Sequence, residues 1–263
     1  MDYRSIIYEK GQCTATIILN RPRSLNALNT EMIDELLHGV RQAGDDPEVK
    51  VLLLTGAGRA FCFGADVSEF RQAHEQAGQD SAWNMLLKSQ KIIRLLTAMP
   101  KPTIAVLNGF ATGLGLDLAL ACDLRIAAER AKLGEAFVSM GLVPDGGGTF
   151  FLPRLVGLAK AAEMIFTGKA IEASEAERIG LINRVVPSHE LIKSARELAD
   201  KLARGPSLAI ALAKEAIWRN LSQNFDSALN FEAQSQKVCL ESEDHREAVK
   251  AFLEKRDPHF RGK

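Results

Sequence analysis

The stretch NGFATGLGLDLALACD (residues 108–123) places three glycines before an apolar run that contains one acid, Asp117. Gly113 and Gly115 predict a sharp turn out of a strand that ends near Leu107, because glycine adopts backbone angles that other residues avoid. The run that follows the turn predicts a helix. The first N–H groups of a helix have no partner within it and lie at the positive end of its dipole. We therefore expect this turn to offer hydrogen-bond donors to a negative charge that develops on a ligand.

The segments around this stretch alternate between strand and helix patterns. A continuous apolar run at 49–58 is typical of a strand buried on both faces, and Thr30 is expected to cap the helix that precedes it. Repeated strand-then-helix order implies right-handed crossovers and mainly parallel pairing, hence an α/β fold. The predicted elements are strands at 13–22, 49–58, 103–109 and 123–129 and a helix at 30–43.

The pattern changes after Pro187, where amphipathic helices are predicted at 188–203, 206–221 and 244–256. Pro206 suits the first turn of the second of these helices. We therefore expect an α/β core at 1–195 and a helical subdomain at 196–263. The 33 basic and 33 acidic residues give zero net charge, so nothing repels like copies of the chain and the helices are expected to pack on another subunit.

Composition excludes several classes of function. The 46% hydrophobic and 25% charged residues are typical of a soluble globular protein, and zero net charge argues against nucleic acids and anionic membranes as partners. The sequence has no long uncharged apolar run and no secretory pattern at its start. The four cysteines lack the spacing of metal sites, as do the histidines, so we expect no metal, free thiols and a cytoplasmic location.

Two further segments combine glycines with acids, RAFCFGADVSEF (59–70) and GLVPDGGGT (141–149). In the second, Asp145 lies between a proline and three glycines and is a turn residue, a helix cap or a catalytic group. The 108–123 stretch lacks the third glycine of a dinucleotide-binding fingerprint, since Leu118 stands there. The sequence also lacks a phosphate-binding GxxxxGK[ST] loop and a GxSxG nucleophile motif. Taken singly, each glycine segment is compatible with turns and close packing.

Taken together, these segments resemble the crotonase superfamily, the enoyl-CoA hydratases and isomerases. The resemblance follows the family order across nearly the whole chain. It implies a spiral of repeated strand–strand–helix units, followed by a C-terminal helical trimerisation region, and a homotrimer or a hexamer of two trimers. The segments that carry it are LNRPRSLNALN (19–29), FCFGAD (61–66), NGFATGLGLDLALACD (108–123), GLVPDGGGT (141–149), GLINRVVP (180–187) and REAVKAFLEKRDPHF (246–260).

The resemblance implies an acyl-CoA thioester substrate whose carbonyl oxygen lies between the N–H groups of Ala65 and Leu114. The family usually has glycine where Leu114 stands, but the donor is main chain. Two such donors stabilise the enolate that forms when a proton next to the thioester is removed. Arg23 is a candidate for the 3′-phosphate of CoA. Other candidates for contact with the substrate are Ala27, Gly64, Asp66, Val67, Ser68, Gly113 and Phe137.

The acid–base groups decide which reaction the resemblance implies. Hydratases of the family use two glutamates, which map to Asp117 and Phe137, and a phenylalanine cannot transfer a proton. Members that shift a double bond from β,γ to α,β, and the similar ring-epoxyphenylacetyl-CoA isomerases, carry an acid at the position of Asp145 and often phenylalanine at 137. We therefore expect an isomerase in which Asp145 and Asp117 are catalytic. Glu135 is close in sequence, but an offset of two residues need not aim it at the same pocket.

Three alternatives stay open at this point. The chain could be a 2-enoyl-CoA hydratase or a non-catalytic scaffold that binds CoA esters. A dehalogenase branch uses an aspartate at position 145 as nucleophile, but it carries Trp and His near the positions of Phe137 and Gln90. Asp117 is equally explained as an acid favoured by the helix dipole. No cofactor is expected beyond the CoA of the substrate, and the three glycines after Asp145 are expected to let an acyl chain pass close to its carboxylate.

Overall fold

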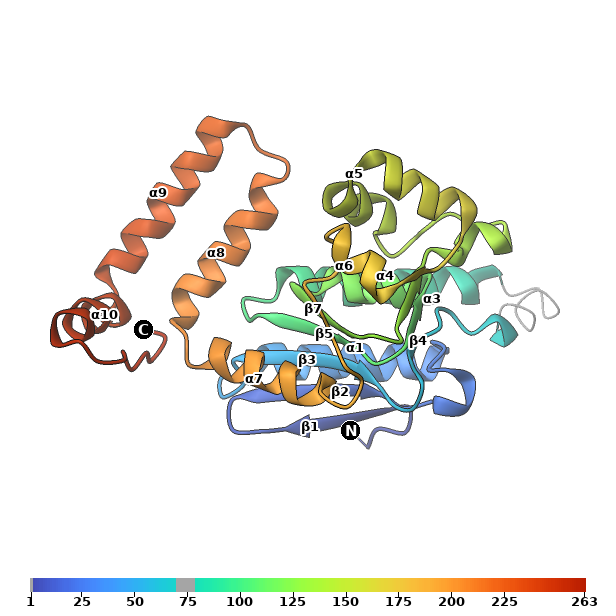
Figure 1. The fold of residues 1–263 in the computed structure, drawn as a ribbon, viewed down its shortest axis with the longest axis horizontal. Coiled ribbons are helices and arrows are strands. Elements are labelled where there is room, and N and C mark those ends of the chain that lie inside the picture. The colour runs from blue at the N-terminus through green and yellow to red at the C-terminus, as the bar shows by residue number, and fades with distance from the viewer. Residues whose placement is uncertain (1, 70–78) are drawn as a thin grey trace.

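Residues 2–69 and 79–263 are described by the structure, a computed structural model (Figure 1). The larger sheet of these residues has six strands in the order β1-β2-β3-β5-β7-β10. β1 and β2 run antiparallel, and the other neighbouring pairs run parallel. The predicted α/β class with mainly parallel pairing is confirmed. The strands are β1 (Ile6–Lys10), β2 (Thr14–Leu19), β3 (Val51–Gly56), β5 (Thr103–Leu107), β7 (Leu124–Ala128) and β10 (Arg184–Val186).

A second sheet, of short strands, creates the edge at which the site lies. In the described residues its order is β4 (Ala60–Cys62), β6 (Phe110–Thr112), β8 (Lys132–Gly134) and β9 (Ile171–Glu172). β4, β6 and β8 run parallel, and each follows a strand of the larger sheet, so the chain repeats strand–strand–helix units as expected. β6 was not predicted, and Gly113 therefore follows β6 rather than the strand that ends at Leu107. Parallel strands bring the loops at their carboxyl ends together.

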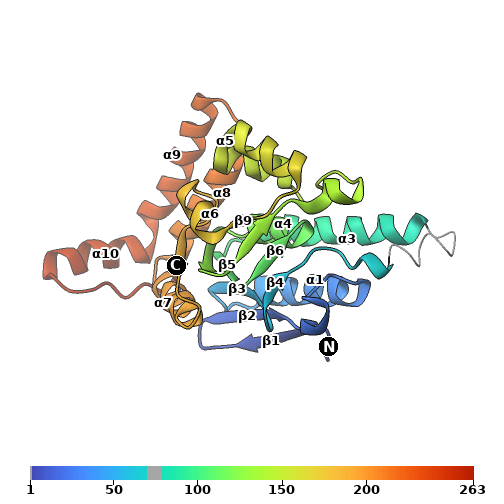
Figure 2. The ribbon, with the colours of Figure 1, turned by 45° about the vertical axis from the view of Figure 1, so that its right-hand side comes forward.

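The helices of the core pack around these sheets (Figure 2). The predicted cap of the first helix was wrong by one residue: Asn29, in extended conformation, accepts a hydrogen bond from the Met32 N–H at 3.0 Å, and Thr30 is the first helical residue. Asn is the stronger of the two residue types at this position. The helices are α1 (Thr30–Asp45), α3 (Gln79–Ala98), α4 (Leu114–Ala121), α5 (Gly148–Thr167), α6 (Ala173–Arg178) and α7 (Leu191–Ala203), with short 3-10 helices at Pro22–Ser24 and Ala136–Met140.

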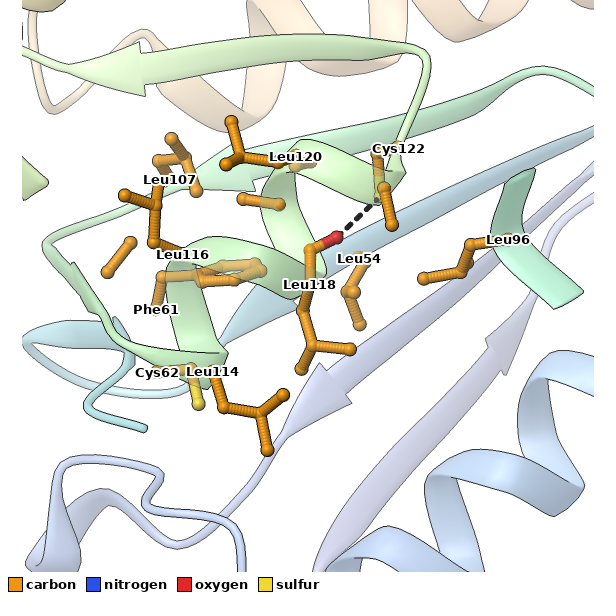
Figure 3. Packing of buried hydrophobic residues seen from close by; sticks show 14 of the residues in the cluster. Leu54, Phe61, Cys62, Leu96, Leu107, Leu114, Leu116, Leu118, Leu120 and Cys122 are labelled. Atoms are coloured by element: carbon orange, nitrogen blue, oxygen red, sulfur yellow. Dashed lines mark hydrogen bonds between the residues drawn. The ribbon is translucent and has the colours of Figure 1, made fainter. Parts of the chain in front are cut away.

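Helix α4 is buried along its whole length (Figure 3). A helix that is apolar on all sides belongs in a core, and this one carries a single acid, Asp117, in its first turn. Cys62 and Cys122 pack around it, and burial raises the pKa of both thiols to about 12. The Cys122 thiol donates to the Leu118 carbonyl at 3.5 Å. Both cysteines are buried packing residues with free thiols.

The C-terminal helices α8 (Ser207–Asn220), α9 (Phe225–Glu241) and α10 (Glu243–Glu254) stand away from the sheets (Figure 1). α9 was not predicted, and none of its residues is fully buried. Pro206 is the N-cap of α8 rather than a residue of its first turn. The buried Lys214 ammonium anchors α8 to the core by donating to Asp123 at 2.7 Å and to the Leu96 carbonyl at 2.9 Å. Each helix in the described part of the chain is too short or too polar to cross a bilayer.

Glu35 of α1 fixes the start of the chain and leads to a first prediction. This buried carboxylate accepts the N–H groups of Arg4 and Ser5 at 2.8 Å each and that of Ile6 at 3.0 Å. Glu35→Gln puts an N–H₂ donor against at least one of these donors, so it should lower the free energy of unfolding by about 1–3 kcal/mol. Urea denaturation measures this change. A loss below about 0.5 kcal/mol, the range of neutral surface substitutions, would contradict the assignment.

Candidate active site

The loops that follow β4, β6 and β8 are joined to one another by hydrogen bonds. The Thr112 hydroxyl donates to the Phe63 carbonyl at 3.0 Å, which ties the loop after β4 to the end of β6. The Gly113 N–H donates to the Gly134 carbonyl at 2.8 Å, which ties the start of α4 to the end of β8. The segments that carry Ala65, Leu114 and Glu135 therefore meet at one edge of the small sheet.

Ala65 and Leu114 present neighbouring main-chain donors. Gly64 has φ +96°, and a Cβ placed on it would lie 3.8 Å from the Leu114 nitrogen. Leu28 pairs with the backbone on both sides of Ala65. Its N–H donates to the Gly64 carbonyl, and its carbonyl accepts the Asp66 N–H. Within the described residues, neither the Ala65 nor the Leu114 N–H donates to another group of the chain. Two unused N–H groups thus lie close together, as an oxyanion site requires.

Phe137 lies beside this turn. A Cβ placed on Gly113, whose φ is +52°, would lie 3.6 Å from a ring carbon of Phe137. The half-buried ring therefore forms a wall of the site. The resemblance maps the second acid of a hydratase to Phe137, and a phenylalanine ring cannot transfer a proton.

The peptide bond between Asp145 and Gly146 is held at both of its polar ends. Its carbonyl accepts from the Gln90 side-chain amide of α3 at 2.9 Å, and its N–H donates to Asp117 Oδ2 of α4 at 3.0 Å. The Asp145 side chain is partly exposed, and burial raises its pKa above the usual value. The backbone that carries Asp145 is therefore fixed, while its carboxyl group can still reach a ligand.

Asp117 and Glu135 form a buried acidic pair behind Asp145, and both have zero exposed area. Burial, and then the charge of Asp145, raises the pKa of Asp117 to about 7. Burial, and then the charge of Asp117, raises the pKa of Glu135 to about 10. A Cβ placed on Gly148 would lie 2.7 Å from Asp117 Oδ1 and 2.8 Å from Glu135 Oε1, so the two carboxyl groups face the same point.

Sequence reasoning left the orientation of Glu135 open, and the structure turns it toward Asp117. The available signal was its place directly after β8, at the same edge as Asp117 and Ala65. The glycines after Asp145 also have an explanation other than the expected passage of an acyl chain. A side chain at Gly146 or Gly148 would collide with the acidic pair, and one at Gly147 (φ +105°) would collide with the Phe151 ring. Packing against buried groups explains these glycines without an acyl chain.

The remaining predicted contact residues lie along the loop before α1 and after Gly64. Arg21, which sequence reasoning missed, donates to Asp66 at 2.8 Å and to the Ala27 carbonyl at 2.6 Å. Asp66 also accepts from the Ser68 N–H and hydroxyl, at 3.1 and 2.6 Å. Arg23 and Val67 are exposed. The described residues contain no cluster of three metal-ligating side chains.

Known proteins resemble this chain in sequence and in fold. The profile of the family described as enoyl-CoA hydratase/isomerase matches residues 9–263. The chain is 40% identical to the short-chain-enoyl-CoA hydratase of Clostridium acetobutylicum over 97% of both chains, and 40% identical to the 1,2-epoxyphenylacetyl-CoA isomerase of Escherichia coli over 97% of both. The crystal structure of an enoyl-CoA hydratase from Bacillus anthracis superposes with a TM-score of 0.93 at 37% identity, and covers 99% of this chain and 100% of that one.

Proposed function

Because the chain belongs to the enoyl-CoA hydratase/isomerase family, we propose that it is an enoyl-CoA isomerase that moves a double bond from the β,γ to the α,β position. It is an acyl-CoA enzyme, and the proposal concerns which reaction of the family it performs. The observation that carries it is the exposure of the three acids at the site. Asp145 is partly exposed, whereas Asp117 and Glu135 are fully buried. One accessible acid suits a proton shuttle better than it suits a pair that activates water.

The geometry supports the following sequence of steps. The thioester carbonyl oxygen accepts the N–H groups of Ala65 and Leu114. The Asp145 carboxylate removes a proton from Cα, and the electron pair of that C–H bond delocalises into the thioester as an enolate. Asp145 then returns the proton to Cγ while the double bond forms between Cα and Cβ. A positioned base contributes about 10²–10⁴-fold to such a step, and one oxyanion donor about 2.7–4 kcal/mol.

The burial of Asp145 favours this role. Burial raises the pKa of Asp145, which makes its carboxylate a stronger base toward the Cα proton. Phe137 beside the turn keeps a second proton carrier away from the reacting carbons. These steps need no cofactor beyond the CoA that the substrate carries, and we propose Ala27, Asp66, Val67 and Ser68, with the Arg23 cation, as its contacts.

A 2-enoyl-CoA hydratase is the second candidate, favoured by relatives that are named as hydratases. Two acids also lie next to each other in the pair Asp117 and Glu135, but neither is exposed to a bound water. A scaffold that only binds CoA esters is disfavoured, since it would not need a base whose backbone is fixed at both ends.

Separate incubations with a 3-enoyl-CoA and a 2-enoyl-CoA test the proposal. We expect the 3-enoyl ester to be converted rapidly to the 2-enoyl ester, and the 2-enoyl ester to be hydrated slowly or not at all. Product analysis by liquid chromatography distinguishes the two outcomes. Rapid hydration of the 2-enoyl ester without isomerisation of the 3-enoyl ester would contradict the proposal and identify the chain as a hydratase.

We also propose a homotrimer, or a hexamer of two trimers, assembled through the C-terminal helices. Large apolar side chains are exposed on them, among them Phe225, Phe252 and Leu253 at 74%, 83% and 75% exposure, and apolar patches of this kind mark interfaces.

α7 packs on the larger sheet through Leu191, Ala195, Ala199 and Ala203. We therefore propose that the helical subdomain begins after α7, a few residues beyond the expected boundary at 195/196. The four free cysteines support a proposed cytoplasmic location.

A further inference from the structure

Glu135 is a buried acid that the proposed steps leave without a role. Within the described residues, neither of its side-chain oxygens has a hydrogen-bond donor, and the same is true of Asp117 Oδ1. An ionised carboxylate can only accept hydrogen bonds, so two facing carboxylates cannot satisfy each other. Burying an unpaired charge is costly, and the cost falls when one of the two carries a proton, because that proton gives the other carboxylate a hydrogen-bond donor.

We infer that Glu135 is a neutral acid that donates its O–H to Asp117 Oδ1, and that Asp117, ionised in this way, fixes the peptide bond after Asp145. The part that concerns catalysis rests on the proposed role of Asp145. Both Glu135 and Asp117 then act as positioning residues, since neither has exposed surface with which to touch a substrate.

The surrounding charges place the proton on Glu135. The charged groups that act on it are Asp117, from α4, and Asp145, from the loop that precedes α5, and both are acids. Asp117 has a competing donor, because its Oδ2 accepts from the Gly146 N–H. That hydrogen bond favours the ionised form of Asp117, whereas Glu135 has no such donor. The pKa of Glu135 is accordingly raised further than that of Asp117.

The hydrogen bond connects Glu135 to the base. Asp117 Oδ2 holds the N–H of the peptide whose carbonyl is held by Gln90, and this peptide sets the direction of the Asp145 side chain. Without the Glu135 donor, the Asp117 anion loses its second partner and is more readily protonated. A neutral Asp117 holds the Gly146 N–H less strongly, because hydrogen bonds to charged acceptors are about twice as strong.

Two substitutions of Glu135 separate the roles of its proton and its charge. Glu135→Gln keeps a donor toward Asp117 without a titrating proton, so kcat for isomerisation should stay within about threefold of the wild type. Glu135→Met keeps the volume but removes the donor, and kcat should fall about tenfold or more with KM little changed, as expected for a base moved off its position. Equal losses in both variants would overturn the inference.

The second arm measures stability and does not depend on any activity. The folded chain keeps the Glu135 proton up to a pH of about 10, whereas the unfolded chain loses it near 4.5. The folded state therefore binds more protons between these values, and stability falls as pH rises through that window. Glu135→Gln lacks this proton, so its Tm should rise relative to the wild type between pH ~5 and ~9. A Tm difference that stays constant over this range would overturn the inference.

Glu35→Gln is the matched control, since Glu35 is also buried but accepts three backbone N–H groups. It should lower Tm and should gain nothing at high pH. Should Glu135→Met fail to fold, the infrared difference between the wild type and Glu135→Gln at neutral pH still decides. We expect the C=O band of a neutral carboxylic acid in the wild type, and carboxylate bands alone would overturn the assignment. If the 3-enoyl-CoA is not isomerised but the pH-dependent Tm difference and the infrared band are both observed, the proposed reaction is wrong. The hydrogen bond from Glu135 to Asp117 is then still supported.

Discussion

Asp145→Asn is expected to lower kcat for 3-enoyl-CoA isomerisation by about 10²–10⁴-fold, the usual contribution of a positioned general base. The amide is nearly the same size as the acid but cannot accept the Cα proton. Gln90 and Asp117 bind the backbone after Asp145 rather than its side chain, so the substitution leaves both hydrogen bonds in place. The loss should therefore appear in kcat with KM nearly unchanged. Steady-state kinetics on a 3-enoyl-CoA measure both quantities.

Asp117→Asn is the control for this prediction. An asparagine at 117 still offers a carbonyl oxygen to the Gly146 N–H, and its effect should be far smaller than that of Asp145→Asn. If Asp117→Asn lowered kcat strongly and Asp145→Asn lowered it only slightly, the assignment would be reversed and the buried Asp117 would be the base. The exposure of the two groups argues against that outcome, because Asp117 has no surface on the site while Asp145 does.

The parts of the fold that could be predicted from the sequence are those with local signals. The apolar run of β3, the amphipathic pattern of α1 and the glycines around α4 each identify their own element. The strands of the small sheet have two or three residues each, too few to show an alternating pattern. No residue of α9 is fully buried, and the half-buried side chains of its packed face include polar ones, so its periodic signal is weak. The family resemblance supplied the strand–strand–helix repeat that these short strands could not.

The candidate site likewise contains groups that could be predicted from the sequence and groups that could not. Ala65 and Leu114 could be placed from sequence because each follows a short motif with fixed geometry, and a main-chain donor does not depend on residue type. The partnership of Glu135 with Asp117 depends on the pairing of β6 with β8, a contact between distant parts of the chain. The role of the glycines after Asp145 depends on the same packing. A motif gives the position of each group along the chain, but only the fold shows which buried carboxyl groups meet.

Gly115→Ala should have the second large effect, because it changes the distance between the two oxyanion donors. A Cβ at 115 would overlap the Cys62 carbonyl oxygen and lie 2.8 Å from the Cys62 Cβ. Both contacts are to the end of β4, which cannot move without the rest of its sheet. The first turn of α4 must therefore shift away from β4 and take the Leu114 N–H with it. Loss of one oxyanion donor lowers kcat by about 10²–10³-fold, or about 2.7–4 kcal/mol.

Gly44→Ala provides the comparison that separates this local effect from a general loss of stability. Gly44 lies in α1, and a Cβ there would make an ordinary contact, 3.5 Å from the Met99 side chain. That variant should gain about 0.5–1 kcal/mol of stability from alanine in a helix and keep its kcat. Gly115→Ala should lose about 1–3 kcal/mol from overpacking, so kcat is measured well below its Tm, where the folded fraction is complete. A folded Gly115→Ala with wild-type kcat would mean that the Leu114 N–H does not bind the oxyanion, and the charge of the enolate would then need a donor other than the start of α4.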